Sequence, residues 1–387
     1  MKRASTVVVG AGVIGASVAW HLASRGAREI LVLDAAPGPG RGSTGVATGG
    51  FRAQFATAIN VRLSLLSRAK LRTFRDEIGA DPGYTPAGYL WIAEDASALA
   101  ALNAAREVQR AEGLHEAVEV GPDDIARLQP AIAPDGIVGG AYCPTDGYIR
   151  PRQILEGYIR AAEGRGVAFT WDEAVTGFDL DSGGAIARVK TARGTIACGA
   201  VVDAAGAWAR AVAALAGVDL PVHPLRRRMA ATQPTDVIAS AAPMTLYCGD
   251  GFHFRERDGR VILSWPTPGN PDDPFDTSVE PSWLHEVAKK KDARIPALRG
   301  VPLDPLASWA GLYEMSPDRH AILGRAASRS NFFLVNGSSG HGVMHAPALG
   351  QLLAEIVLDG KATTLDATPL SPDRFAVGRS IASPEIL

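Results

Sequence analysis

Short apolar runs alternate with segments of helical periodicity near the start of the chain. Residues 6–9 (TVVV) form an apolar, β-branched run that predicts a buried parallel strand. Residues 16–24 have helical character, Gly26 ends this helix, and residues 29–34 predict a second strand that closes on an acidic residue. The order of strand, helix and strand predicts a βαβ unit, so we expect the chain to begin with a parallel sheet.

The same pattern returns after a long interval. Residues 174–180, 185–191 and 195–197 predict a meander of strands with turns between them. Residues 200–208 (AVVDAAGAW) then predict a buried strand, a glycine turn and the start of a helix. We infer that the first domain resumes here, after a departure near residue 80.

The pattern of predicted elements changes after this segment. Residues 226–228, 252–256 and 260–265 predict strands of an antiparallel sheet, and the Asp-Gly pair between the last two is a strong hairpin signal. Toward the end of the chain, residues 337–342 form a glycine-rich loop, and an apolar helix is expected over residues 347–358.

The composition is that of an ordinary globular protein, because 47% of its 387 residues are hydrophobic and 21% are charged. This length favours two domains. A formal net charge of −2 gives no reason to expect nucleic acid or an anionic membrane as a partner. The apolar stretch 196–220 is interrupted by Asp203 and Arg210, so we expect no transmembrane segment. Three scattered cysteines form no metal or disulfide framework, which favours a reducing, cytoplasmic location without a bound metal.

The turn after the first strand has a dinucleotide fingerprint, GAGVIG. Gly10 allows a tight turn, and Gly12 leaves room for a pyrophosphate at the helix N-terminus. Gly15 lets the helix and the strand pack closely. Asp34 closes the next strand, where its carboxylate can accept hydrogen bonds from ribose hydroxyls. The spacing fits FAD as well as NAD, and Asp34 argues only against NADP, whose 2′-phosphate it would repel.

Two further loops suit a polar ligand. Residues 41–50 (RGSTGVATGG) are dense in Gly, Ser and Thr, which suits a backbone that passes close to a ligand, although a flexible surface loop has the same composition. The later glycine loop, residues 337–342, comes just before a helix, where backbone donors converge on an electron-rich group.

Several motifs follow in a fixed order over nearly the whole chain. They are GAGVIGASVAWHL with Asp34, STGVATGGFRAQF, CPTDGYIRP, VVDAAGAWA, WAGLYEMSPDRHAILG and NGSSGHGVMHAPALG. Together they resemble the FAD-dependent D-amino-acid oxidase superfamily, particularly the branch of sarcosine oxidase β-subunits, dimethylglycine-type dehydrogenases and dye-linked L-proline dehydrogenase β-subunits.

The pattern and the resemblance together predict the fold class. It is α/β, with a discontinuous, Rossmann-like FAD-binding domain plus an α+β substrate domain with a mainly antiparallel sheet. The FAD-binding domain is expected from residues 1–80, 144–220 and 306–387, and the substrate domain from residues 81–143 and 221–305.

The resemblance implies that residues from most of these motifs bind FAD. The implied residues are Gly10, Gly12, Val13, Ile14, Gly15, Asp34, Ser43, Thr44, Thr48, Gly49, Gly50, Val175, Gly206, Trp208, Gly311, Gly340, His341, Gly342, Val343 and Met344. The last five would line the pyrimidine side of the flavin, where backbone N–H groups can stabilise the reduced ring.

Three departures from the relatives predict that FAD is bound non-covalently. Single-subunit sarcosine oxidases attach FAD through a cysteine in the segment that matches Gly311, and they have a lysine where Met344 stands. Heterotetrameric sarcosine oxidases attach FMN through a histidine in the segment that matches residues 147–158, which contains no histidine here.

Four residues are candidates for the catalytic site. Arg52 is the first, because arginine binds a carboxylate bidentately and the family has an arginine here near the substrate carboxylate. His253 lies on a predicted strand of the substrate domain. Tyr313 and Glu314 follow a glycine beside the flavin, and an alternating strand would direct only one of them inward. Glu314 could pair with a substrate ammonium, and the basic run 226–228 could offer a second carboxylate contact or a basic edge strand.

The resemblance implies oxidation of the C–N bond of a secondary, cyclic or N-methylated amino acid, such as sarcosine or proline, by hydride transfer to flavin N5. The expected partner is a small-molecule amine or amino acid, with partner subunits or a homo-oligomer as further possibilities. One alternative is a D-amino-acid dehydrogenase. The other is a non-catalytic FAD-fold subunit or assembly factor, because residues 371–387 resemble the end of a mitochondrial assembly factor for respiratory complex I.

Overall fold

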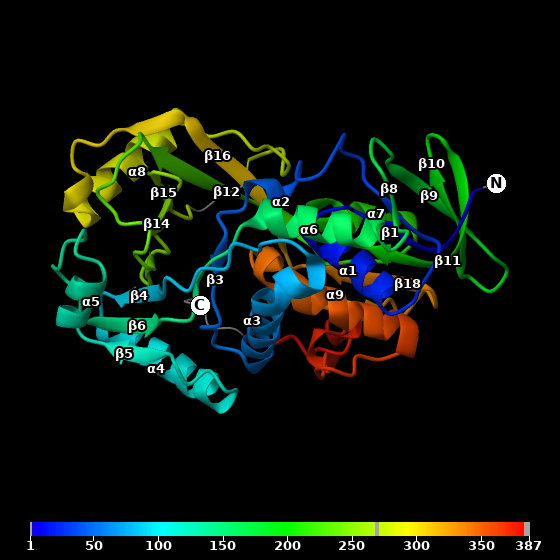
Figure 1. The fold of residues 1–387 in the computed structure, drawn as a ribbon, viewed down its shortest axis with the longest axis horizontal. Helices are drawn as coiled ribbons and strands as arrows, with labels where there is room; N and C mark the ends of the chain where they lie inside the picture. The colour runs from blue at the N-terminus through cyan, green and yellow to red at the C-terminus, as the bar shows by residue number, and fades with distance from the viewer. Residues whose placement is uncertain (1, 268–270, 383–387) are drawn as a thin grey trace.

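The computed structural model describes residues 2–267 and 271–382 of the chain. Two lobes lie side by side, and each is built on one eight-stranded sheet (Figure 1). The first lobe contains the N-terminal βαβ unit, and the second contains the segment that was expected to be mainly antiparallel. The predicted α/β fold class is therefore confirmed.

The first sheet contains the strands predicted for the βαβ unit and its continuation. Its strands are β1 (Lys2–Val9), β2 (Ile30–Leu33), β8 (Ala168–Thr170), β9 (Val175–Leu180), β10 (Ile186–Thr191), β11 (Gly194–Asp203), β17 (Ile322–Arg325) and β18 (Phe332–Asn336). The order is β17-β18-β11-β1-β2-β8, and β10 and β9 continue from β11 as an antiparallel meander. Val8 packs on one face of β1, while Val7 and Val9 pack on the other. Burial on both faces explains the uninterrupted apolar run of β1.

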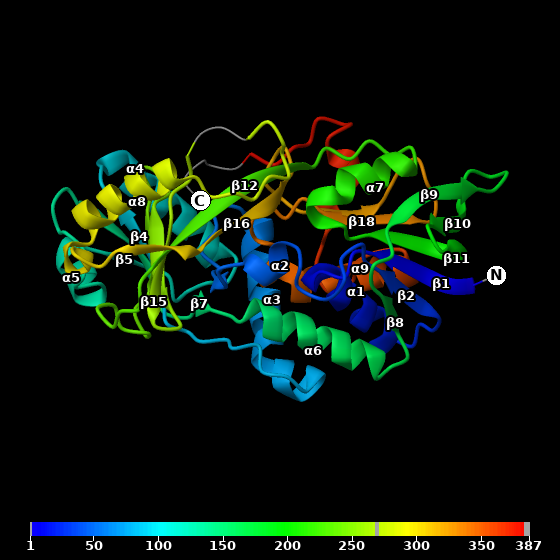
Figure 2. The ribbon, with the colours of Figure 1, turned by 90° about the horizontal axis from the view of Figure 1, so that it is seen from above.

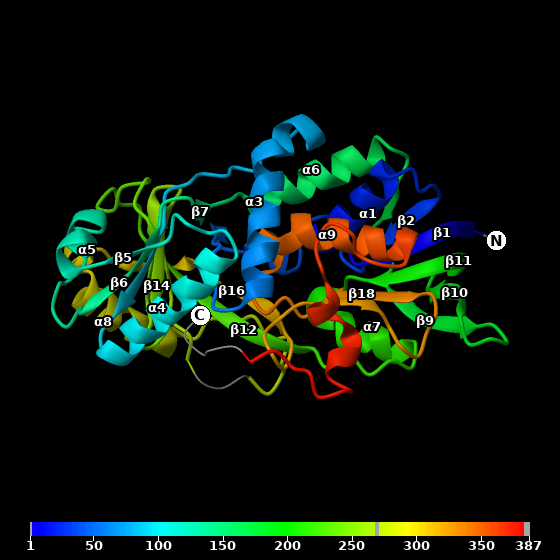
Figure 3. The same cartoon turned by 90° about the horizontal axis from the view of Figure 1, so that it is seen from below.

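Helices cover both faces of the first sheet. In the first lobe they are α1 (Val13–Ser24), α2 (Ser43–Val46), α3 (Ala58–Ile78), α6 (Pro151–Glu163), the 3₁₀ turn η1 (Gly206–Trp208), α7 (Ala209–Leu215) and α9 (Gly342–Asp359). Figure 2 shows α1, α6 and α9 on one face of the sheet and α7 with β9 on the other. Figure 3 shows α3 standing between the two lobes.

The second sheet is antiparallel except for one pair of strands. Its strands are β4 (Tyr89–Ala93), β5 (Val118–Val120), β6 (Gly139–Cys143), β12 (His223–Thr232), β13 (Met244–Tyr247), β14 (His253–Arg257), β15 (Arg260–Ser264) and β16 (Leu303–Met315). Their order is β16-β12-β15-β14-β13-β4-β6-β5, and β13 pairs with β4 in parallel. At the turn between β14 and β15, Asp258 and Gly259 have φ angles of +55° and +75°, as a two-residue hairpin with matching twist requires.

The remaining elements complete the second lobe and connect it to the first. They are β3 (Gly50–Phe51) and β7 (Gly147–Tyr148), which pair with each other, the helices α4 (Ala96–Ala111), α5 (Pro122–Leu128) and α8 (Pro281–Arg294), and the 3₁₀ turns η2 (Pro296–Leu298), η3 (Thr368–Leu370) and η4 (Pro372–Arg374). In the described part of the chain, no helix has the length and apolar character needed to cross a lipid bilayer.

Two elements differ from their predicted form. β16 was expected with the FAD-binding domain, but it pairs with β12 in the second sheet along most of its length. β12 itself pairs with β15 only at Ala230 and Ala231, so the basic run 226–228 is paired on one side only, by β16. α9 begins at Gly342 rather than near Pro347, because turn hydrogen bonds start the helix first: His341 N donates to Ser338 O at 2.8 Å and His345 N to His341 O at 3.1 Å. The domain boundaries themselves stay a proposal.

Candidate functional site

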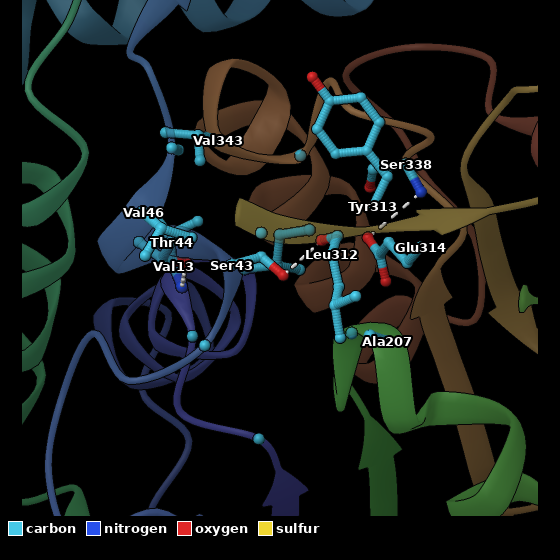
Figure 4. A pocket seen from close by; sticks show the side chains of 18 of the residues that line it. Val13, Ser43, Thr44, Val46, Ala207, Leu312, Tyr313, Glu314, Ser338 and Val343 are labelled. Carbon is cyan, nitrogen blue, oxygen red and sulfur yellow. Dashed lines mark hydrogen bonds between the residues drawn. The ribbon is translucent and has the colours of Figure 1, made fainter. Parts of the chain in front are cut away.

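A cavity of about 910 Å³ lies where the two lobes meet. This volume is near the upper end of the range of about 300–1,000 Å³ that is usual for ligand sites. Its lining combines the carboxyl ends of β1, β2 and β11 with α2, the start of α9 and parts of β12, β14 and β16 (Figure 4). The carboxyl ends of parallel strands are where open α/β sheets bind ligands.

The first end of the cavity is made of backbone. Gly10 has a φ angle of +101°, and a Cβ there would lie 2.4 Å from the Ala204 carbonyl oxygen. A Cβ on Gly15 would lie 1.9 Å from the Gly10 carbonyl oxygen, so only glycine lets α1 start against this turn. A Cβ on Gly12 would meet only Thr44 Oγ1, at 3.5 Å, and would otherwise project into the cavity. The N-cap residue of α1, Gly12, has no side chain that could cap the helix, so the N–H groups of the first turn and the helix dipole favour an anion there.

Asp34 lies beside this turn at the end of β2. Its carboxylate accepts hydrogen bonds from Ala11 N at 2.7 Å and from Ala36 N at 2.8 Å. These donors fix both oxygens in orientation, and each oxygen keeps a lone pair for a hydroxyl in the cavity. Val175 also lines this end, and Trp208 lies at the rim with 46% of its surface exposed.

The short helix α2 holds the middle of the cavity together. Thr44 Oγ1 accepts a hydrogen bond from Val13 N at 3.2 Å, and Ser43 Oγ donates to Leu312 O at 2.6 Å (Figure 4). The hydroxyl pair therefore connects the start of α1 to β16. This explains why the Gly-, Ser- and Thr-rich loop is ordered rather than a flexible surface loop.

The second glycine loop closes the cavity from the other side. Gly340 has a φ angle of +92°, and a Cβ there would lie 2.5 Å from the ring of Tyr313. Ser339 N donates to Glu314 O at 3.0 Å, which fixes the loop against β16. The start of α9, from Gly342 to Met344, then faces the cavity.

Arg52 dominates the second end of the cavity. Its side chain is buried, at 6% exposure, and its guanidinium carbon lies 3.8 Å from the ring centroid of Phe55 and 5.0 Å from that of Trp91. The guanidinium donates to Gln54 O and, at 3.2 Å, to His341 Nε2. Within residues 2–267 and 271–382, no carboxylate forms an ion pair with it. Burial lowers the pKa of Arg52, and the charge of Asp146, which forms no ion pair with it, offsets only part of this effect.

A carboxylate that sequence reasoning missed holds the Arg52 segment in place. Asp146 is fully buried, and it accepts hydrogen bonds from Ala53 N at 2.8 Å and from Gln54 Nε2 at 3.2 Å. Burial raises the pKa of Asp146 to about 6, even though these donors favour its charged form. Asp146 belongs to a Pro-Thr-Asp-Gly sequence that predicts only a turn. Its hydrogen bond to Ala53, 93 residues away in the chain, could not be predicted from this local sequence.

The histidines around the cavity are neutral. Burial lowers the pKa of His253, His341 and His345, and for His345 to about 3. His253 Nδ1 lies 2.9 Å from Gly251 O, which assigns the proton to Nδ1 and leaves Nε2 as an acceptor. His341 Nε2 accepts from Arg52, so its proton is on Nδ1. A neutral His341 orients Arg52 without competing with it for an anion.

Tyr313 and Glu314 point in opposite directions from β16. In Figure 4 the ring of Tyr313 points to one side of the strand and the carboxylate of Glu314 to the other, toward Ala207. Glu314 Oε1 accepts from Ser338 N at 3.2 Å. This geometry favours Tyr313 over Glu314 as the residue that faces a substrate.

The Glu314 carboxylate belongs to a buried acidic pair. Glu314 Oε2 and Asp203 Oδ2 are buried and have no hydrogen-bond partner in the described chain. Burial raises the pKa of Glu314 to about 7 and that of Asp203 to about 8, and the charge of Glu314 raises the Asp203 value further. Asp203 Oδ1 accepts from Ala205 N at 3.0 Å, directly before the η1 turn. No sequence pattern marks this pair, because its two members come from strands of different sheets.

The structure brings together nearly all residues proposed from the sequence. Those that line the cavity are Gly10, Gly12, Val13, Ile14, Asp34, Ser43, Thr44, Thr48, Gly49, Gly50, Arg52, Val175, Gly206, Trp208, His253, Gly311, Tyr313, Glu314, Gly340, His341, Gly342, Val343 and Met344. Gly15 lies behind the lining, in contact with the Gly10 turn. In the described residues, no group of His, Cys, Asp and Glu side chains is arranged to hold a metal ion.

Other lining residues had no recognisable pattern. Tyr89, Met244 and Leu246 come from the second sheet, whose strands alternate without a motif. Arg227 was proposed only as one of three consecutive arginines, and only the fold shows that it alone faces the cavity. Strand alternation could have separated it from its neighbours, but the face that lines a cavity is set by tertiary packing.

The cavity fits the cofactor expected from the sequence. Its first end combines a helix N-terminus whose N-cap is glycine, an open Gly12 position and a fixed Asp34 carboxylate, which match a pyrophosphate and a ribose. Its middle lies between two glycine-rich loops, which suits a flat ring system. A Cβ on Gly311 would lie 2.7 Å from Val46 Cγ2, so a side chain at this position would require Val46 to move. Non-covalent binding stays a prediction.

Comparisons with known proteins agree with this fit. The family model described as DAO, FAD dependent oxidoreductase, matches residues 5–356. FAD-dependent oxidoreductase domain-containing protein 1 of Xenopus laevis is 28% identical, over 97% of this chain and 83% of the relative. The glycine oxidase of Geobacillus kaustophilus (strain HTA426) is 27% identical, over 96% of this chain and 97% of the relative. A crystal structure of L-proline dehydrogenase from P. horikoshii has a TM-score of 0.90 and 28% identity, over 98% of this chain and 100% of that chain.

Proposed function

Because the chain belongs to the DAO family of FAD-dependent oxidoreductases, we propose that it oxidises the C–N bond of an amino acid whose nitrogen is secondary, cyclic or N-methylated. The bound flavin supplies the acceptor for two electrons, and the protein supplies orientation and electrostatics. The names of the glycine oxidase and of the L-proline dehydrogenase support an amino acid as the substrate. The imine product then hydrolyses in water.

The unpaired guanidinium of Arg52 is the observation on which this proposal depends. It lies in the FAD cavity, two residues after Gly50, and is held by Phe55, Trp91 and His341. A buried cation without an anion is costly unless a ligand supplies the charge. A substrate carboxylate supplies it and anchors the amine at the flavin.

Two further groups support the amine end of the substrate. His253 offers a neutral Nε2 acceptor, which can bind the N–H of a neutral secondary amine. Burial raises the pKa of Tyr313, so its hydroxyl stays protonated and can donate a hydrogen bond. Neither group has to act as a base, because a neutral amine already has its lone pair free.

Replacing Arg52 tests the carboxylate clamp. We expect Arg52→Met to raise KM for a carboxylated amine by about 100-fold, since a buried charge pair is worth about 2–5 kcal/mol, with a smaller change in kcat. Arg52→Lys keeps the charge but not the bidentate geometry and should give an intermediate KM. Arg150→Met removes an exposed arginine paired with Asp258 and should leave KM unchanged. An unchanged KM for Arg52→Met would remove this role from Arg52.

Anaerobic addition of amines to the purified holoenzyme separates the three candidate functions. Loss of flavin absorbance with sarcosine, proline or related secondary amines supports the proposal. Bleaching by D-amino acids alone favours a D-amino-acid dehydrogenase. No bleaching by any member of the panel favours the non-catalytic subunit. This alternative agrees with the name of the Xenopus relative, which mentions no substrate. Residues 383–387, part of the segment that suggested this alternative, lie outside the described residues.

A further inference from the structure

Building on the proposed function, we propose that the substrate is a dianionic amino acid. It is a secondary or N-substituted amine with two carboxylates, of which one binds Arg52 and the other binds Arg227. Both arginines line the same cavity, and they come from distant parts of the chain: Arg52 follows β3 of the two-stranded sheet, and Arg227 lies on β12 of the second eight-stranded sheet.

Arg227 is the only member of its arginine run that is left without a carboxylate in the described chain. Its neighbours on β12 are both paired: Arg226 contacts Asp276 at 2.9 Å and Glu280 at 2.5 Å, and Arg228 contacts Glu280 at 2.6 Å. Arg227 lies between them in sequence, so its side chain points to the opposite face of the strand. That face lines the cavity.

The surroundings of Arg227 hold it at the cavity without neutralising it. Its recorded hydrogen bond is to the Arg226 carbonyl oxygen at 3.3 Å, and its guanidinium carbon lies 5.6 Å from the ring centroid of Tyr313. β12 pairs with β16 in a register that places Arg227 opposite Gly311. Arg227 therefore reaches the cavity beside Tyr313, and burial lowers its pKa as burial does for Arg52.

The two guanidiniums are held at different places around one chamber. Arg52 is anchored to His341 on the second glycine loop, while Arg227 is anchored to β12 and the ring of Tyr313. His253 and Tyr313 line the same cavity and experience the charge of both arginines, so the four side chains are neighbours. A substrate amine that contacts His253 or Tyr313 would thus lie close to both guanidiniums.

Charge balance favours two carboxylates over one. A single carboxylate bound to either arginine would leave the other cation buried without an anion, which is costly. One carboxylate shared by both would have to reach two separately anchored groups at once. A neutral amine with two carboxylates supplies one anion to each guanidinium. N-carboxymethyl amino acids and N-methylated acidic amino acids have this chemistry.

Binding of non-oxidisable acids to the holoenzyme tests the two anionic subsites directly. We expect glutarate and succinate to perturb the flavin absorption spectrum with a Kd about tenfold or more below that of butyrate and acetate. Arg227→Met should abolish this preference by weakening the dicarboxylates, while the monocarboxylates stay within about twofold. Arg227→Lys should restore part of it. Arg228→Met, on the opposite face of β12, is the matched control and should keep the wild-type ratio of Kd values.

Turnover provides the second arm of the test. The expected result is that iminodiacetate and N-methylglutamate have a kcat/KM at least about tenfold above that of sarcosine, and that Arg227→Met reverses the order. Equal Kd values for both classes of acid overturn the dicarboxylate site even if amines still bleach the flavin. The same holds if Arg227→Met weakens both classes equally or loses FAD. Failure of every amine to bleach the flavin instead overturns the proposed function, while the acid titration still decides between one and two anionic subsites.

Discussion

The two ends of the cavity are built from different materials. The nucleotide end is made of glycine backbone, a helix N-terminus and a single carboxylate. These come from the first 34 residues and from β11, the strand that pairs with β1. The substrate end is made of charged and aromatic side chains, among them Arg52, Arg227 and Tyr313, which come from distant parts of the chain. The first end binds through shape and backbone dipoles, whereas the second binds through unpaired charge.

This difference has a consequence for tolerance to substitution. Backbone that lies against backbone cannot relax when a side chain is added, so the nucleotide end should fail as a unit. Long side chains that converge on open space can be shortened one at a time, so the substrate end should lose affinity stepwise and keep its fold. We therefore expect the largest loss of stability when a side chain is added to the packed backbone of the nucleotide end, at a glycine that lies behind the cavity lining.

Gly15→Ala should produce this largest effect. Its Cβ would lie 1.9 Å from the Gly10 carbonyl oxygen, so α1 or the Gly10 turn must move. We expect a loss of more than about 3 kcal/mol in the free energy of unfolding and loss of bound FAD, measured by denaturant titration and by flavin content. Gly121→Ala is the control, since a Cβ there meets no heavy atom within 4 Å, and it should cost less than about 1 kcal/mol. A stable Gly15→Ala protein that retains its yellow flavin would contradict the expectation that the backbone of the nucleotide end cannot relax.

The same difference decides what the sequence could reveal. Gly10, Gly12, Gly15 and Asp34 are close together in the chain, and their geometry follows from one local unit, so their spacing predicts their roles. Asp146 acts on the segment of Arg52 from 93 residues away, and its local sequence predicts only a turn. Long-range contacts of this kind leave no periodic signal.

The fold shows the same division. Both faces of the first sheet are buried, and the Asp-Gly hairpin of β14 and β15 has the φ angles that its sequence predicts. The pairing of β16 with β12 was not predictable, because strand order in an antiparallel sheet depends on packing between distant segments. The basic run 226–228 was a candidate from the sequence, and the fold shows that Arg227 is the member of this run that lines the cavity.

The buried acidic pair, Asp203 and Glu314, lies at the border of the two ends and should change the free energy of unfolding by an intermediate amount. Burial raises the pKa of Asp203 to about 8 and that of Glu314 to about 7, while both groups titrate near 4 in an unfolded chain. Between these values the folded protein retains protons that the unfolded chain has released, so the free energy of unfolding falls as the pH rises. We expect the pair to contribute a loss on the order of 2 kcal/mol between pH 6 and pH 8. Urea titration measures it as the difference between the wild-type holoenzyme and a variant with neutral isosteres, because both proteins share the opposing contribution of the buried histidines.

Neutral isosteres isolate this contribution. The double variant Asp203→Asn and Glu314→Gln should lack the loss from the acidic pair, and its dependence should be flatter than that of the wild type above about pH 7.5, where the unfolded-state histidines have mostly released their protons. The buried histidines act in the opposite sense below that pH, because burial lowers the pKa of His21 and His345 to about 3. The same pH dependence in the wild type and the double variant from pH 6.5 to 8.5 would show that the pair is ionised in the folded protein.

The smallest effect is expected at the substrate end, where His341 orients Arg52. His341→Phe removes the acceptor for the Arg52 Nη2 group, which lies 3.2 Å from Nε2, and keeps a ring that can pack edge-on against Phe55. Because Arg52 keeps its hydrogen bond to Gln54 and its aromatic contacts, the loss should be about 1 kcal/mol, or a rise in KM of about fivefold with kcat nearly unchanged. Steady-state kinetics with a carboxylated amine separate this positioning role from proton transfer. A large fall in kcat with an unchanged KM would mean that the imidazole takes part in the chemistry, and the substrate end would then act through more than charge and orientation.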